Sequence, residues 1–450
     1  MRSRRRQTLQ PGRGWLGLFP IALVALLLTG CASTPSEPEI ILQPSGPGEI
    51  EVQFELDPPV SELAFAQPAT RMRLQQWQVL DDDLILQQDA LHNTAHGERL
   101  DRARVRIHAE PGPRYREYPP VIAFADGGLL VHTATLIPAG VDQMQLYLEA
   151  GDWHTAIPAH EPNTQAVVDT FDPERITGIW VYLGPEPARE THYGHLVVDP
   201  GLPEALVTEA QTLLAAAHDY FSERMGERRR PLLAAIHQIE RDPAVLEGDF
   251  SRGPSLRLGI GAPDELLQAG IRPPALSERA LAHLIGHEMG HRWNTDLIRP
   301  EAGPAAAWMV EGSAELFALR FSEHLGLRDE TDREAEISTN ITECREVLER
   351  RPLADIQPPE PDYRAHYSCG LIFSLLTEQA FTEGDIFVFW QLMNALFHEA
   401  SEYTQENYLG VLAEYGGEET VTAIARMITD SEADRAALLD EALQEAGIRP

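Results

Sequence analysis

The strongest constraint on the fold is a change of hydrophobic period along the chain. In stretches such as "DRARVRIHAE", apolar residues alternate with arginines, and Pro/Gly turns separate several such stretches. This period of two is typical of half-buried strands, so we predict an antiparallel β-sandwich-like domain over residues 49–197. After Asp199-Pro200 apolar residues recur at helical spacing, and from Pro274 onward almost every segment favours helix. We therefore predict an α+β protein with a helical C-terminal region over 331–450.

The first 30 residues have the three parts of a secretory signal: a basic head, an apolar run and a small-residue ending. The ending, "LTGC", resembles the lipobox of bacterial lipoproteins. The resemblance implies that residues 1–30 are a lipoprotein signal peptide, that Cys31 is lipidated, and that a lipid bilayer is a partner. Ala32 after the cysteine implies sorting to the outer membrane, facing the periplasm. A plain signal peptide or an uncleaved anchor helix is the alternative, although the apolar run from Trp15 to Leu28 is short for a spanning helix.

Composition narrows the range of partners. Residues 31–48 are rich in Ser, Pro and Glu, which predicts a flexible tether. The formal charge is −34, and removal of residues 1–30 takes away five arginines and no acid, which gives −34 − 5 = −39. A chain this acidic repels nucleic acid, which we exclude as a partner. Once Cys31 is lipidated, Cys344 and Cys369 remain; in an oxidising periplasm they either pair in one disulfide or stay as buried thiols.

Two histidines in "ERALAHLIGHEMGHRW" predict a metal site. Ser277 is a good N-cap preceded by two prolines, so we expect a helix to begin there. His287 and His291 then lie on one face of the helix, one turn apart, where both imidazoles reach a zinc ion at roughly 2.0–2.1 Å. Glu288 lies beside the water that such an ion binds. The five-residue motif also arises by chance, so the prediction depends on a third ligand.

The third ligand separates the classes of zinc peptidase. The metzincin pattern needs Gly at position 294 and His at 297, whereas this chain has Asn294 and Leu297. The stretch "AAWMVEGSAELFALRF" instead offers Glu311 among apolar neighbours, and a carboxylate buried there requires a metal or a basic partner. Glu315 follows one turn later and is the candidate to accept the other ring N–H of a zinc-binding histidine. The alternative for both glutamates is a solvated helix surface.

These residues resemble the gluzincin metallopeptidases. "HEMGHRWNTDLIRP" resembles the signature of the glycyl aminopeptidase family, and "WMVEGSAELF" is similar to segments of that family and, more distantly, of the aminopeptidase N family. The resemblance implies a thermolysin-like catalytic domain over 198–330 and one Zn²⁺ per chain, held by His287, His291 and Glu311. "YRAHYSCGLIFSLL" resembles the segment in which both families place a tyrosine that stabilises the transition state, which implies this role for Tyr367.

The predicted activity follows from these residues. Zinc lowers the pKa of its bound water towards about 7, and Glu288 takes the proton as general base before it passes it to the leaving amine. Tyr367 is expected to hold the oxyanion; Tyr363 and His366 are alternatives, and a purely structural tyrosine is another. We therefore predict a membrane-anchored zinc metallopeptidase that hydrolyses peptide bonds in peptide or protein substrates, as an aminopeptidase.

Substrate recognition is where the chain departs from these families. The stretch Ser255–Ile260 predicts an edge strand that binds substrate backbone by strand addition. In both families a glutamate near this strand binds the substrate's free amine, but "GDFSRGPS" contains no glutamate. Asp249 offers a negative charge there instead, so Asp249 and Ser255 are the candidate substrate-binding residues. A periplasmic endopeptidase and a catalytically inactive binding lipoprotein are the alternatives to an aminopeptidase.

Overall fold

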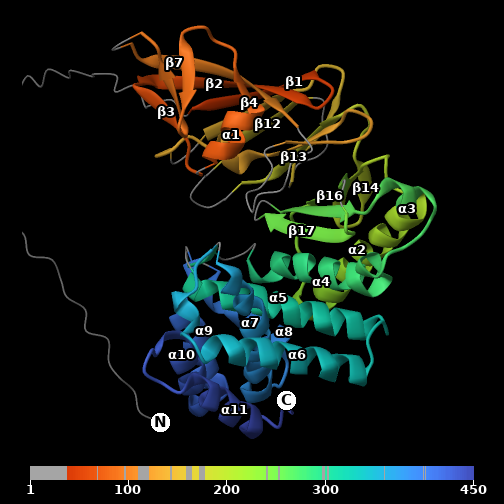
Figure 1. Ribbon diagram of the computed structural model, residues 1–450, viewed down its shortest axis with the longest axis vertical. Coiled ribbons are helices and arrows are strands. Elements are labelled where there is room, and N and C mark those ends of the chain that lie inside the picture. Colours follow the sequence, from red (N-terminus) through yellow and green to blue (C-terminus); the bar gives the residue numbers. More distant parts are fainter. Residues whose placement is uncertain are drawn as a thin grey trace, which may run out of the picture. The chain divides into compact units, whose positions relative to one another are not determined.

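The computed structural model describes residues 38–449 except 68, 96–97, 110–120, 142–143, 159–164, 172–177, 240–241, 252–253, 296–298, 302–303, 359, 399 and 401. The predicted signal peptide and Cys31 lie outside these residues. Among the helices that are described, none has the length and apolar character needed to cross a membrane. Strands dominate the N-terminal half of the chain and helices the C-terminal half (Figure 1), so the predicted α+β class is confirmed.

The β-rich N-terminal part contains a six-stranded, a four-stranded and a three-stranded sheet within the described residues. Every second residue of β2 is buried from Ile50 to Leu56, and Ile50 and Phe54 share one hydrophobic core with Val131 and Val181 of the four-stranded sheet. Two sheets on either side of a core make the predicted sandwich, although β1 and β10 pair in parallel. The strand orders are β12-β10-β1-β2-β7-β4, β11-β13-β9-β8 and β3-β6-β5. The elements are β1 (Glu39–Gly46), β2 (Glu49–Val60), β3 (Glu62–Ala64), α1 (Thr70–Gln76), β4 (Trp77–Val79), β5 (Leu84–Gln87), β6 (Ala90–Asn93), β7 (Leu100–His108), β8 (Val121–Ala123), β9 (Leu129–His132), η1 (Thr133–Leu136), β10 (Met144–Glu149), β11 (His154–Ala156), β12 (Gln165–Phe171) and β13 (Trp180–Gly184).

Two of the predicted domain boundaries are wrong. The tether predicted over 31–48 does not extend over Glu39–Gly46, because that segment is β1 and pairs with both β2 and β10. Ile40 and Leu42 alternate with more exposed residues and are fully buried, a pattern that the Ser/Pro/Glu composition around them concealed. The β-rich domain also ends with β13 rather than at residue 197, because the next two strands belong to a different sheet.

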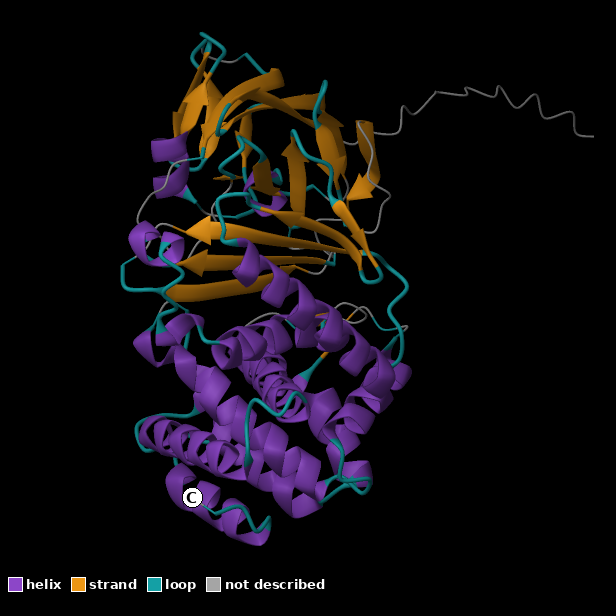
Figure 2. Cartoon of the chain, turned by 90° about the vertical axis from the view of Figure 1, so that its right-hand side faces the viewer, coloured by secondary structure: helices purple, strands orange, loops and turns teal. Residues whose placement is uncertain are grey.

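That next sheet has five strands and carries the helices on one face (Figure 2). Its order is β14-β15-β16-β18-β17; β15, β16 and β18 run parallel, and β14 and β17 are antiparallel to their neighbours. The strands are β14 (Arg189–Thr191), β15 (Gly194–Val198), β16 (Leu232–Ile239), β17 (Val245–Ser251) and β18 (Ser255–Gly261). The opposite face packs against the four-stranded sheet through a cluster that includes Trp180 and Leu233.

The predicted edge strand lies inside this sheet. The segment Ser255–Ile260 forms most of β18, which is buried along its whole length between β16 and β17. Leu256 and Ile260 face the helical core, and the alternate polar residues face the four-stranded sheet. The alternation therefore marks two covered faces rather than one solvated face, and the edge strand is β17.

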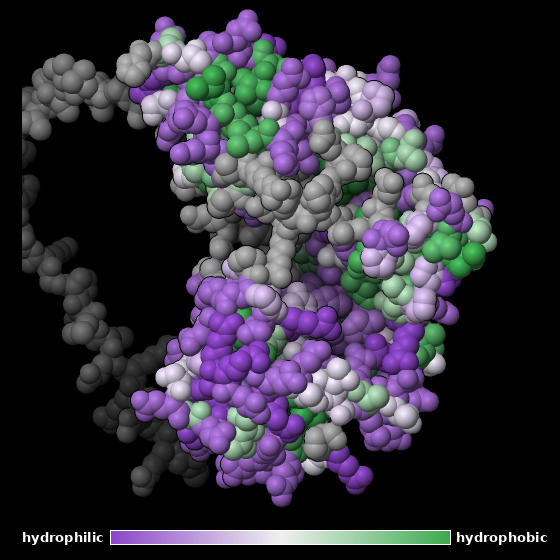
Figure 3. All heavy atoms as spheres, viewed as in Figure 1, coloured by the Kyte–Doolittle hydropathy of each residue, from purple (hydrophilic) through white to green (hydrophobic). Residues whose placement is uncertain are grey.

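The helices follow and surround the C-terminal core. Ser277 caps α4 as predicted, because its side chain accepts a hydrogen bond from the backbone of Ala280 at 3.3 Å. On the face seen in Figure 3 the helical part is mostly hydrophilic, in keeping with the acidic composition. The elements are α2 (Glu204–Met225), α3 (Asp264–Gln268), η2 (Pro274–Leu276), α4 (Glu278–Asn294), β19 (Arg299–Pro300), α5 (Pro304–His324), α6 (Glu330–Leu348), η3 (Leu353–Asp355), η4 (Pro361–Arg364), α7 (Ala365–Ala380), α8 (Ile386–Phe397), β20 (Glu402–Tyr403), α9 (Gln405–Tyr415), α10 (Glu418–Thr429) and α11 (Arg435–Glu445).

Two glycines let α5 and α7 approach to backbone contact. A Cβ atom on Gly312 would lie 2.1 Å from the carbonyl carbon of Gly370, and one on Gly370 would lie 2.5 Å from the carbonyl oxygen of Trp308. Neither methyl group fits without separating the helices, since the neighbouring atoms belong to the backbone. This crossing brings Glu311 of α5 and Tyr367 of α7 to the same region.

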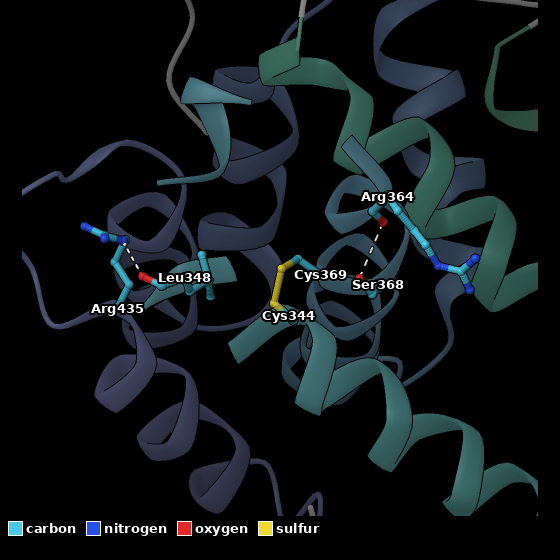
Figure 4. Close-up of a disulfide and its surroundings, with 6 residues drawn as sticks. All are labelled: Cys344, Leu348, Arg364, Ser368, Cys369 and Arg435. Atoms are coloured by element: carbon cyan, nitrogen blue, oxygen red, sulfur yellow. Dashed lines mark hydrogen bonds between the residues drawn. A yellow bond between two sulfur atoms is a disulfide. The ribbon is translucent and has the colours of Figure 1, made fainter. Parts of the chain in front are cut away.

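A disulfide joins α6 to α7 (Figure 4). Cys344 and Cys369 are paired, both sulfurs are buried, and the bond closes a separation of 25 residues. Next to it, the hydroxyl of Ser368 donates to the carbonyl of Arg364 at 3.4 Å, and Arg435 donates to the carbonyl of Leu348 at 2.9 Å. The cross-link thus ties the helix that carries Tyr367 to the helix before it.

Candidate metal centre and active site

Three side chains from two helices converge on one point. α4 carries His287 and His291 one turn apart, and α5 carries Glu311. Nε2 of His287 lies 3.1 Å from Nε2 of His291 and 3.2 Å from Oε2 of Glu311. The third side of the triangle, from Nε2 of His291 to Oε2 of Glu311, measures 3.4 Å. The structure therefore brings together all three predicted metal ligands.

The triangle has the dimensions of a zinc site. Ligand atoms at about 2.0–2.1 Å from a tetrahedral zinc ion are about 3.3–3.4 Å apart, because a tetrahedral edge is ~1.63 times the bond length. The three measured separations, 3.1, 3.2 and 3.4 Å, lie close to this value. Two imidazole nitrogens and one carboxylate oxygen are also donors that zinc prefers, and three protein ligands leave one position for water or substrate. The residues present fit a zinc ion.

The charges around the triangle favour a cation. Burial alone would raise the pKa of Glu311, but His291 and His287 hold it well below its ordinary value. Burial is likewise outweighed at Glu315, where His283 and His287 keep the pKa of the carboxyl well below its usual range. Burial lowers the pKa of His287, but the hydrogen bonds that its ring donates to Glu311 and Glu315 outweigh this and raise the pKa well above its ordinary value. Two partly buried carboxylates that stay ionised make this a negative site.

The outer nitrogen of each histidine faces an oxygen acceptor. Nδ1 of His287 lies 3.3 Å from Oε1 of Glu315, the residue predicted to face it. Nδ1 of His291 lies 3.3 Å from Oδ1 of Asn294. The amide of Asn294 is held in this orientation because its Nδ2 donates to the hydroxyl of Ser313 and to a backbone carbonyl, both at 2.9 Å. We did not predict this role for Asn294; its spacing of three from His291 on one helix is the signal that could have revealed it.

Glu288 lies beneath the edge strand β17. Its side chain is buried, and burial raises the pKa of its carboxyl to about 7. A Cβ atom on Gly248 would lie 2.6 Å from Cγ and 2.8 Å from Oε1 of Glu288. The strand can cross so close to the carboxylate because residue 248 is glycine. The role of Gly248 was not predicted, because the neighbouring strand β18 was expected to be the edge strand.

Tyr367 lies against the metal triangle. Its ring stacks on that of His287, with centroids 5.8 Å apart and an interplanar angle of 19°. The charge of Glu311 and burial raise the pKa of its hydroxyl well above the ordinary value, so the group stays a hydrogen-bond donor. Of the alternatives, His366 is buried and its Nε2 donates to the carbonyl of Ile356 at 3.3 Å, whereas Tyr363 is half-buried and its ring is tilted by 54° against that of His366. Tyr367 is thus the candidate in ring contact with a predicted ligand.

The two predicted substrate-binding residues have structural partners instead. Oδ2 of Asp249 accepts a hydrogen bond from Nε1 of Trp180 at 2.6 Å, and Oδ1 pairs with Arg257. Ser255 is fully buried, and its hydroxyl accepts from the backbone N–H of Trp180 at 3.0 Å. Both predictions are wrong because this face of the sheet is covered by the four-stranded sheet. Glu247, two residues before Asp249 on β17, also faces Arg257, at 4.0 Å.

The fold is similar to that of two solved enzymes. A mutant of an M1 zinc metallopeptidase from Deinococcus radiodurans, bound to a Tyr-Ser-Ala substrate, matches 88% of this chain and 94% of its own, with a TM-score of 0.50 and 15% identity. Native yeast LTA4 hydrolase matches 91% of this chain and 70% of its own, with a TM-score of 0.50 and 12% identity. The sequence itself matches no protein-family model and no curated protein. The likeness shows that the chain shares the fold of these enzymes.

Proposed function

We propose that this chain is a zinc metallopeptidase that hydrolyses peptide bonds. The observation that carries the proposal is the triangle of donor atoms from His287, His291 and Glu311, with the buried carboxylate of Glu288 beside it. The fold shared with an M1 zinc metallopeptidase supports it. The same donor set supports one zinc ion per chain.

A bound zinc ion supplies Lewis acidity, which polarises a peptide carbonyl and lowers the pKa of water to about 7. Glu288 takes the proton of the attacking water and returns it to the leaving amine, as general base and then general acid. Tyr367 donates a hydrogen bond to the carbonyl oxygen as negative charge develops on it. Asn294 and Glu315 hold the outer nitrogens of the two histidines and so keep their Nε2 atoms directed at one point.

The substrate backbone binds along β17. This strand is the edge of its sheet and crosses over Glu288, so an extended peptide can add to it as a further strand. We propose aminopeptidase-like cleavage, which the resemblance implies and the Tyr-Ser-Ala complex of the fold relative supports. An endopeptidase is the second candidate. Glu247 and Asp249 both face Arg257 on one side of β17, whereas a Cβ on Gly248 would point to Glu288 on the other side. Neither acidic side chain is therefore directed at Glu288 to bind a free amine there.

Hydrolysis of a mixed peptide library with free and blocked N-termini tests the function and separates the two candidates. We expect cleavage that stops when a chelator removes zinc and returns when zinc is added. An aminopeptidase loses activity on blocked peptides, whereas an endopeptidase keeps it. Zinc content well below one equivalent together with absence of cleavage would instead favour a catalytically inactive binding lipoprotein.

We also propose that the enzyme is a lipoprotein of the outer membrane that faces the periplasm, anchored through Cys31. The lipobox-like ending of the first 30 residues supports this proposal. Mass spectrometry of the mature N-terminus tests it, since a diacylglyceryl group on Cys31 is expected. Recovery of an unmodified N-terminus, or of an intact leader, would contradict the anchor.

A further inference from the structure

A second group of ionisable side chains lies behind Glu315, on the side away from the metal triangle. His283 precedes His287 by one turn on α4, Arg328 lies between α5 and α6, and Glu336 lies on α6. Nε2 of His283 is 3.0 Å from Oε2 of Glu315, and Nη2 of Arg328 is 3.1 Å from Nδ1 of His283. The guanidinium of Arg328 also pairs with Glu336. The four side chains are mostly buried, with exposures of 7–23%.

The contacts fix the direction of each hydrogen bond. A guanidinium only donates, so Nδ1 of His283 is the acceptor from Arg328. The ring proton of neutral His283 therefore resides on Nε2 and is donated to Oε2 of Glu315. Because that oxygen is occupied, Oε1 is the atom of Glu315 that faces Nδ1 of His287, at 3.3 Å. The series Arg328, His283, Glu315 and His287 thus ends on a predicted metal ligand.

The same group resembles a second metal site without its ion. His283, Glu315 and Glu336 each offer one ligand atom, and these atoms lie within 4.8 Å of one another. Arg328 contacts both His283 and Glu336, so its positive charge already lies among these donors. A guanidinium balances the carboxylates as a second cation would.

We propose that His283 is a positioning residue for the metal centre, and that Arg328 takes the place of a second cation and keeps the centre mononuclear. His283 holds one oxygen of Glu315 so that the other oxygen orients His287 towards the zinc ion. This inference rests on the proposed function, because it takes His287, His291 and Glu311 as the zinc ligands. Loss of such an outer partner weakens metal binding by about 10- to 100-fold in other zinc proteins.

The test is the zinc dissociation constant of the full-length protein, measured by competition with a fluorescent chelator. His283→Phe removes both hydrogen bonds, and we expect zinc to bind about 10- to 100-fold more weakly. His283→Gln can donate to Glu315 and accept from Arg328, so we expect an affinity within about threefold of wild type. The exposed His398→Phe serves as the matched control and is expected to leave affinity unchanged. Thermal unfolding of the zinc-free proteins shows whether each variant is folded.

Equal affinities of wild type and a folded His283→Phe variant would overturn the positioning role, as would equal losses in the Phe and Gln variants. Two zinc equivalents in wild type that fall to one in His283→Phe would overturn the mononuclear assignment and make His283 a ligand. Failure of the proposed function gives a different result. In that case wild type itself binds no zinc tightly, or binds it and cleaves no peptide, whatever residue 283 is.

Discussion

Substitution of Gly248 by alanine tests the position of the edge strand over Glu288, the proposed general base. An added Cβ would lie 2.6 Å from Cγ, 2.8 Å from Oε1 and 2.9 Å from Cδ of Glu288. Ordinary contacts of a Cβ atom begin at 3.4 Å, so strand and carboxylate must separate by 3.4 − 2.6 = 0.8 Å. Displacement of a catalytic group by about 1 Å costs on the order of 100-fold in rate.

The cost to stability is expected to be smaller than the cost to catalysis. An extra methyl group in a packed site destabilises by about 1–3 kcal/mol, and β17 can relax outward because it is an edge strand. Zinc content is expected to stay at one equivalent, because the three atoms nearest to the added Cβ all belong to Glu288 and none to a predicted zinc ligand. The predicted signature is a fall of about 100-fold in kcat with zinc retained.

The assay is steady-state peptide hydrolysis with zinc analysis and thermal unfolding of the same samples. Gly410→Ala is the control, since a Cβ there meets nothing within 4 Å and the residue is exposed on α9. Gly410→Ala is expected to keep wild-type kcat. A folded Gly248→Ala protein with wild-type kcat and full zinc would refute the placement of β17 over Glu288.

Three further predictions follow from other parts of the structure. Glu288→Gln is expected to keep zinc and lose about 100- to 10,000-fold in kcat; wild-type turnover would contradict its role as base. Burial lowers the pKa of His132 to about 4 in the folded protein, compared with 6.5 in the unfolded chain. The stability of the fold is therefore full above pH 6.5 and is lost as the pH falls from 6.5 towards 4. Between pH 7 and pH 5 the free energy of unfolding, measured with urea, should therefore fall by about 2 kcal/mol less for His132→Gln than for wild type. Equal decreases in the two proteins would contradict this role of His132. Gly370→Ala should destabilise by about 1–3 kcal/mol or more and lower kcat, because α5 and α7 must separate; an unchanged Tm would show that the crossing is loose.

The residues of the candidate site were predictable because they are close together in sequence. His287 and His291 are one helical turn apart, and the spacing alone places both on one face of α4. Glu311 and Glu315 were identifiable for the same reason, as carboxylates one turn apart on an apolar helix. The start of α4 at Ser277 followed from the capping preference of serine, and the structure confirms it.

What could not be predicted depends on pairing between distant segments. The sequence of β18 alternates apolar and polar residues, but only the sheet order shows that β17 lies outside it. The four-stranded sheet that covers Ser255 and Asp249 is more than 60 residues away along the chain, as the contacts with Trp180 show. The close approach of Gly248 to Glu288 and of Gly312 to Gly370 likewise depends on tertiary contact, for which glycine alone carries no specific signal.

The most direct test of the account is the location of zinc in crystals of the purified protein, from anomalous scattering on either side of the zinc absorption edge. We predict one strong peak per chain, at about 2.0–2.2 Å from Nε2 of His287, Nε2 of His291 and a carboxylate oxygen of Glu311. A main peak elsewhere, for instance among His192, His218 and Asp219, whose ligand atoms also lie within 4.8 Å of one another, would contradict the proposed centre. So would the absence of any peak at the triangle after zinc is added.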